Sequence, residues 1–83
     1  MPTIIRSGGF AIRILFPPRE HGPPHVHVVK GGAEVVIRLG EPGELVELVT
    51  VYGMKRSDMV RAVRLVQIWK DDLLAMWKAT HGE

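Results

Sequence analysis

The stretch HVHVVKGGAEVVIR, residues 25–38, decides how this chain folds. Two runs of six residues, rich in valine, flank Gly31-Gly32, and glycine adopts the positive φ angles of a two-residue hairpin turn without strain. The turn sets the register, because a slip of one residue would exchange the two faces of the hairpin. The expected pairs are Lys30–Ala33, Val28–Val35 and Val26–Ile37 on the core face, and His25–Arg38, His27–Val36 and Val29–Glu34 on the other.

Further strand patterns lie on both sides of this hairpin. Residues 10–16 alternate, with one apolar face, and Pro17-Pro18 ends them because proline has no N–H for a sheet. An apolar stretch over residues 3–6 precedes them, separated by a turn signal at residues 7–9. Residues 45–52 predict one more strand, although Glu47 and Thr50 interrupt its alternation. The face expected in the core from residues 10–16 consists of Phe10, Ile12, Ile14 and Phe16.

From Ser57 onward the apolar spacing changes to three and four residues, which predicts a helix over residues 57–80. Ser57 is the expected N-cap, and Asp58 lies in the first turn, where the helix dipole favours a negative charge. A helix of this length measures about 36 Å, more than a small sheet covers. We therefore expect either a break near residues 70–72 or a far end that packs on another chain.

These elements predict one α+β domain spanning residues 1–83. Residues 1–52 form an antiparallel sheet of four or five strands, and one long C-terminal helix packs on one face of it. The net charge of +2 is too small to indicate a nucleic-acid binder by itself, so nucleic acid stays an open partner. The absence of cysteine excludes thiol catalysis and Cys-ligated zinc. With no apolar membrane-length run and no signal-peptide pattern, we expect a cytoplasmic protein without a membrane partner.

Three of the four histidines lie within seven residues, in His21-Gly-Pro-Pro-His25-Val-His27. His25 and His27 point the same way on a strand, and Glu34 is the diagonal neighbour of His27 across the hairpin. Imidazoles and a carboxylate are ligands for a divalent metal, so His25, His27 and Glu34, with His21 as a fourth, form a candidate metal site. No other cofactor is predicted. In the alternative interpretation, these are half-exposed sheet histidines bonded to a loop carbonyl, to Arg38 or to water.

The same histidines also permit acid–base catalysis. Imidazole titrates near pH 6.5 when unperturbed, so His25 and His27 can divide the roles of acid and base at neutral pH. Arg38 would then hold a phosphodiester, as in a metal-independent nuclease. The other interpretation of the arginine is a solvated surface.

The helix carries two features that bear on partners. Its first half is basic, with four cationic residues against Asp58, which suits either a solvated face or contact with phosphates. Trp69 and Trp77 lie two turns apart with Leu73 between them, and tryptophan is enriched both in cores and at interface centres. For Trp77, at the far end, we expect an interface. The predicted partner is a small protein or a second copy of the chain.

Motifs along the chain carry a resemblance to one family. Three segments match. They are the opening residues 1–4, Phe16 followed by Glu20-His21-Gly22-Pro23-Pro24-His25-Val26-His27, and the helix residues Trp69, Leu73-Leu74 and Trp77. In them the chain resembles a bacterial family catalogued as domain of unknown function 4160. It departs from the family at Val26, usually aromatic, at residues 54–57, where Leu-Pro is common, and at residues 70–72, which lack a helix histidine.

The resemblance implies a component of a toxin–antitoxin module, encoded beside a second small protein, and no activity carries over to particular residues. We therefore expect a small cytosolic bacterial interaction protein. The alternatives are a nuclease-type enzyme and a histidine-based metal module. An exposed apolar patch along Trp69 and Trp77 would favour the interaction protein. A cleft bringing Arg13 or Arg38 near both histidines would favour the enzyme. Converging imidazole nitrogens would favour the metal.

Overall fold

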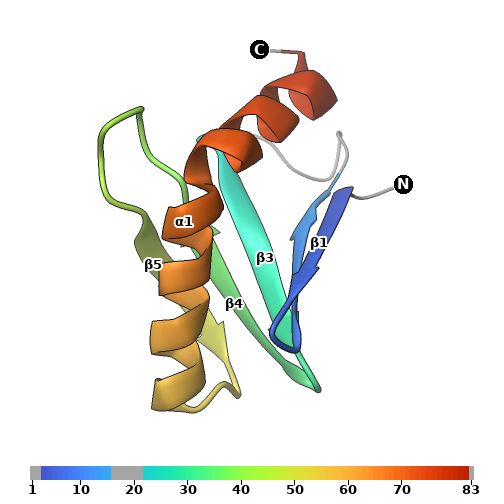
Figure 1. The fold of residues 1–83 in the computed structure, drawn as a ribbon, viewed down its shortest axis with the longest axis vertical. Coiled ribbons are helices and arrows are strands. Elements are labelled where there is room, and N and C mark those ends of the chain that lie inside the picture. Colours follow the sequence, from blue (N-terminus) through green and yellow to red (C-terminus); the bar gives the residue numbers. More distant parts are fainter. Residues whose placement is uncertain (1–2, 16–21, 83) are drawn as a thin grey trace.

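A computed structural model describes residues 3–15 and 22–82, which form five strands and one helix (Figure 1). The strands follow each other in the sheet in the order β1-β2-β3-β4-β5, and every neighbouring pair is antiparallel. This confirms the predicted α+β fold. The elements are β1 (Thr3–Ser7), β2 (Phe10–Ile14), β3 (His25–Lys30), β4 (Ala33–Arg38), β5 (Glu47–Tyr52) and α1 (Arg56–His81).

The central hairpin has the predicted register. Its six pairs run from Lys30–Ala33 beside the turn to His25–Arg38 at the open end. Gly31 in the turn has a φ angle of 60°, which glycine adopts without a steric penalty. Lys30 and Ala33, the pair of the predicted core face beside the turn, are half-buried. The other four residues of that face are fully buried, namely Val26, Val28, Val35 and Ile37.

Strand β2 extends the same core face. Phe10, Ile12 and Ile14 are buried and alternate with half-buried residues, as the pattern predicts. The strand ends at Ile14, and Phe16 and His21 lie outside the described residues. Lys30 occupies the hairpin's core face at its edge, where its Nζ donates to Asp58 Oδ1 at 3.1 Å.

Strand β5 begins at Glu47, two residues later than predicted, because the preceding segment is bonded to the helix. Val46 N donates to Gln67 Oε1 at 2.9 Å. The buried Lys70 Nζ donates to the carbonyl of Glu41 at 2.6 Å and also to that of Glu44. The register of β5 against β4 shifts between Val36 and Ile37, which explains the imperfect alternation.

The start of the helix differs from the prediction. The N-cap is Lys55, which makes no side-chain capping bond, so the assignment of Ser57 is wrong. The helix begins earlier because Met59 N already donates to the carbonyl of Lys55 at 3.0 Å. At the other end, Gly82 has a φ angle of 75° and its N–H donates to Lys78 O, which closes the helix.

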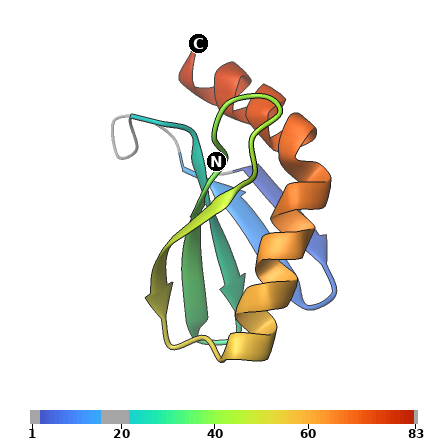
Figure 2. The same ribbon diagram turned by 90° about the vertical axis from the view of Figure 1, so that its left-hand side faces the viewer.

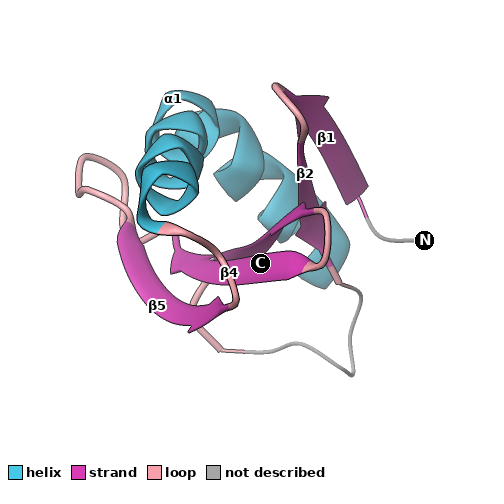
Figure 3. Cartoon of the chain, turned by 90° about the horizontal axis from the view of Figure 1, so that it is seen from below, coloured by secondary structure: helices cyan, strands magenta, loops and turns pink. Residues whose placement is uncertain are grey.

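The long helix neither breaks near residues 70–72 nor needs another chain to cover its far end. It is continuous, and its last turns lean over the upper ends of the strands (Figures 1 and 2). Seen from below, α1 lies on one side of the sheet (Figure 3). The helix buries one stripe against β2, β3 and β4, and this stripe includes Ala62, Val66, Leu73, Leu74 and Trp77.

Candidate functional site

The two strand histidines lie side by side, with ring centroids 5.5 Å apart in an edge-to-face arrangement. His25 begins β3, at the end of the sheet over which the helix leans, and its ring centroid lies 5.1 Å from that of Trp77. Trp77 in turn stacks on His81 with the centroids 3.7 Å apart. Four rings therefore lie in succession from β3 to the last turn of α1, namely His27, His25, Trp77 and His81.

His27 makes a short polar contact with Glu34. Its Nδ1 lies 2.7 Å from Glu34 Oε2, and both side chains are partly buried. The predicted diagonal placement of Glu34 is thus confirmed. An ionised carboxylate only accepts hydrogen bonds, so Nδ1 is the donor and Nε2 is the basic nitrogen of the neutral ring.

His25 is hydrogen-bonded to a loop carbonyl, as the alternative interpretation of the histidines predicts. Its Nδ1 donates to Pro23 O at 3.0 Å. Since a carbonyl accepts, the neutral ring again has its basic nitrogen at Nε2. Both imidazoles therefore have the same tautomer, each fixed by a different neighbour.

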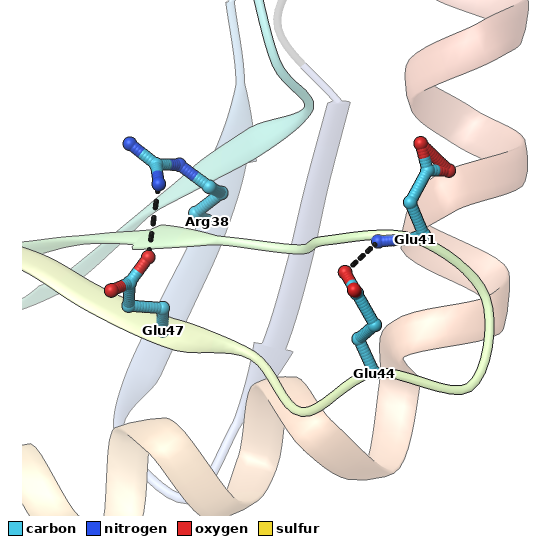
Figure 4. A network of polar contacts seen from close by, with 4 residues as sticks. All are labelled: Arg38, Glu41, Glu44 and Glu47. Atoms are coloured by element: carbon cyan, nitrogen blue, oxygen red, sulfur yellow. Dashed lines mark hydrogen bonds and ion pairs between the residues drawn. The ribbon is translucent and has the colours of Figure 1, made fainter.

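Two arginines lie near this pair, one for each histidine. Arg38 is opposite His25, and together with Pro23, Val36 and Val49 they line a shallow hollow of about 220 Å³. The guanidinium Nη1 of Arg38 donates to Glu47 Oε1 at 3.0 Å, and both side chains are exposed (Figure 4).

Arg13, from β2, is the direct cross-strand neighbour of His27. Its Nε is buried and has no hydrogen-bond partner among residues 3–15 and 22–82. The hollow that Arg38 shares with His25 does not include His27.

The predicted metal ligands are not assembled among residues 3–15 and 22–82. No group of three or more His, Cys, Asp or Glu side chains there is arranged to hold an ion. His27 and Glu34 are hydrogen-bonded to each other through Nδ1 and Oε2. The predicted fourth ligand, His21, lies outside the described residues.

The predicted partner-binding residues are only partly accessible. Trp77 and Leu73 are each 1% exposed, whereas Trp69 is 37% exposed. The prediction that Trp77 and Leu73 lie on an accessible surface is wrong, because the last turns of α1 pack on the molecule's own sheet. The burial of Trp77 makes it a core residue of this chain.

A different accessible apolar surface surrounds the free edge of the sheet, with side chains on both faces of β5 and one residue from the first half of α1. We call it the edge surface, and it comprises Leu48, Val49, Val51, Tyr52 and Val60, which are 39–58% exposed. Beside it runs a groove of about 410 Å³, lined by Leu48, Arg56, Met59, Val60, Val63 and Arg64.

Sequence reasoning missed the edge surface and the position of His81 beside Trp77. It named Arg13 as a possible neighbour of the histidines but did not predict its place directly opposite His27. Apolar residues on both faces of residues 45–52 were the available signal for the edge surface, since a half-covered strand alternates more cleanly. The spacing of four between Trp77 and His81 was the signal for their stack. The position of Arg13 opposite His27 depends on the register between β2 and β3, and no short turn between these strands sets that register.

Comparison with known proteins yields one match. Residues 9–78 match the family described as Domain of unknown function (DUF4160). No curated protein and no solved structure matches the chain. Within the described residues, no helix combines the length and the apolar character that a membrane span requires.

Proposed function

Since the chain belongs to the DUF4160 family, we propose that it is a small cytosolic bacterial protein that binds a second small protein in a toxin–antitoxin-like pair. The contact is the edge surface. The observation that carries the proposal is the exposure of apolar side chains on both faces of a strand that ends the sheet.

The backbone of β5 supports this proposal. Among the described residues, no strand neighbours β5 on its outer side. Edge strands are commonly protected by charges, proline or bulges, and β5 has one charged residue, Glu47, and no proline. Its one irregularity lies toward Glu47, at the register shift. The residues from Thr50 to Tyr52 thus offer a regular edge to which a partner's strand can add.

The test is co-purification of the chain with the small protein encoded beside its gene, followed by calorimetric titration. Val60→Glu places a charge in the groove, and we expect it to weaken the complex at least tenfold. Ile68→Glu is the matched control, because Ile68 is an exposed apolar residue of α1 that does not line the groove. Circular dichroism establishes that both variants fold. Equal weakening by the two variants, or no complex with the wild-type chain, contradicts the proposal.

The pairing of His27 with Glu34 favours a second candidate, a nuclease-type activity. Glu34 would orient His27 as the base, His25 would act as the acid, and Arg38 would contact a phosphate in the hollow it shares with His25. General acid–base groups contribute roughly 10²–10⁴-fold to rates. We expect His27→Ala to abolish RNA cleavage by the purified chain in the presence of a chelator, and Glu34→Gln to reduce it. An unchanged rate in His27→Ala excludes this candidate.

A further inference from the structure

The groove beside β5 has a charge pattern that specifies its occupant. Arg56, Val60 and Arg64 follow one another at intervals of four along α1, and all three line the groove. Its middle is apolar and its two ends are cationic. Neither arginine has an ion-pair partner among the described residues.

The positive charge at this end of the helix is not balanced locally. Lys55, Arg56, Arg61 and Arg64 stand against one acidic residue in residues 55–64, Asp58. Asp58 is buried and bonded to Lys30, so its charge is already compensated. The rim of the groove therefore attracts anionic side chains.

The spacing of this rim fits an extended strand. Eight helical residues, the distance from Arg56 to Arg64, rise about 12 Å. Four residues of a β-strand span about 13–14 Å. A strand added to β5 points alternate side chains at α1, so residues at positions i, i+2 and i+4 meet the groove.

We propose that the partner segment is an extended strand with acidic residues at i and i+4 and an apolar residue at i+2. This inference rests on the proposed function and names the chemistry of the partner. The acidic residues pair with Arg56 and Arg64, the apolar residue packs on Val60 and Leu48, and the strand backbone bonds to β5.

Two other occupants fit less well. A second copy, added through β5 in a two-fold arrangement, brings the cationic rims of the two helices onto the same side of one sheet, where they repel. A nucleic acid would use the arginines and leave the apolar middle of the groove, with Met59 and Val63, without a matching surface.

The experiment uses synthetic peptides and the whole chain. Thr-Glu-Thr-Val-Thr-Glu-Thr presents the proposed pattern, Thr-Lys-Thr-Val-Thr-Lys-Thr reverses its charge, and Thr-Glu-Thr-Glu-Thr-Val-Thr has the same composition with the wrong spacing. Binding is followed by NMR shifts of β5 and α1 amides, which detect millimolar affinities. We expect the first peptide to bind at least tenfold more tightly than either of the others, and to lose affinity as salt is raised.

Charge reversal in the protein provides the matched control. Arg56→Glu/Arg64→Glu should exchange the preference, so that the lysine peptide binds more tightly. Lys78→Glu changes an exposed cation near the other end of α1 and should change nothing. A peptide N-methylated at alternate residues, which cannot complete the strand bonds, should lose binding in one of the two methylation registers.

The outcomes separate this inference from the proposed function. One outcome is that Val60→Glu weakens binding of the natural partner but Arg56→Glu/Arg64→Glu does not. That result supports the edge surface as the contact and contradicts the acidic strand as its occupant. The acidic strand is also wrong if the three peptides bind equally, if light scattering shows a dimer through β5, or if a short RNA displaces the acidic peptide from the groove. Absence of any complex with the natural partner contradicts the proposed function itself.

Discussion

The central hairpin and β5 have similar valine-rich sequences but very different environments. Val26, Val28, Val35 and Ile37 are fully buried, whereas Leu48, Val49 and Val51 are 39–49% exposed. The difference comes from position in the sheet. Strands β3 and β4 are interior strands that contact α1. Strand β5 ends the sheet, and its Leu48 lines an open groove beside α1. Apolar composition alone therefore does not distinguish a core strand from an exposed edge strand.

The largest effect should come from the cross-strand pair that joins these two regions. Ile37 in β4 and Leu48 in β5 are opposite each other, one fully buried and the other 39% exposed. Ile37→Ala should cost about 2–5 kcal/mol of unfolding free energy, because it leaves a cavity in the core. Leu48→Ala should cost less than about 1 kcal/mol. Urea denaturation measures both, and similar losses would contradict the assignment of β5 as an exposed edge.

An intermediate effect should follow from loosening the segment that leads into β5. Lys70→Met keeps much of the side-chain volume but leaves the carbonyls of Glu41 and Glu44 without their donor. We expect a loss of about 1–3 kcal/mol and faster amide hydrogen exchange at Val46. The exposed Lys78→Met is the control. Unchanged exchange at Val46 would show that Gln67 alone holds this segment.

The smallest effect should come from the ion pair between the hairpin and β5. Arg38 and Glu47 are bonded at 3.0 Å, with side chains 48% and 65% exposed. Exposed pairs contribute about 0–1 kcal/mol and weaken with salt. Glu47→Gln should therefore change stability by no more than about 0.5 kcal/mol in physiological salt, as measured by thermal unfolding. A larger loss would mean that this pair, and not the backbone ladder, holds β5 in place.

The sequence predicted those parts of the fold that depend on short-range rules. Gly31-Gly32 fixed the hairpin, and with it the placement of Glu34 diagonal to His27. The spacing of apolar residues gave the helix to within one residue at each end. It could not show where the helix would lie, so Trp77 was assigned to an interface although it packs at the end of the sheet.

The candidate sites divide in the same way. His25 and His27 were recognisable because they are close in sequence. The groove joins residue 48 to residues 56–64, across the end of β5, and its formation depends on how α1 crosses the sheet. Lys70 looked like part of a helix break because charges cluster at residues 70–72, yet its long side chain reaches back to the turn before β5.

The order of the strands has a consequence for how the chain is made. Each strand pairs with its neighbour in sequence. The sheet therefore forms through contacts that are local in sequence and can assemble strand by strand as the chain grows. The helix that covers the sheet is synthesised after all five strands. A nascent chain thus presents the apolar face of a finished sheet before its cover arrives, and the interval before Leu73 and Trp77 are synthesised is the period in which the protein most needs protection from aggregation.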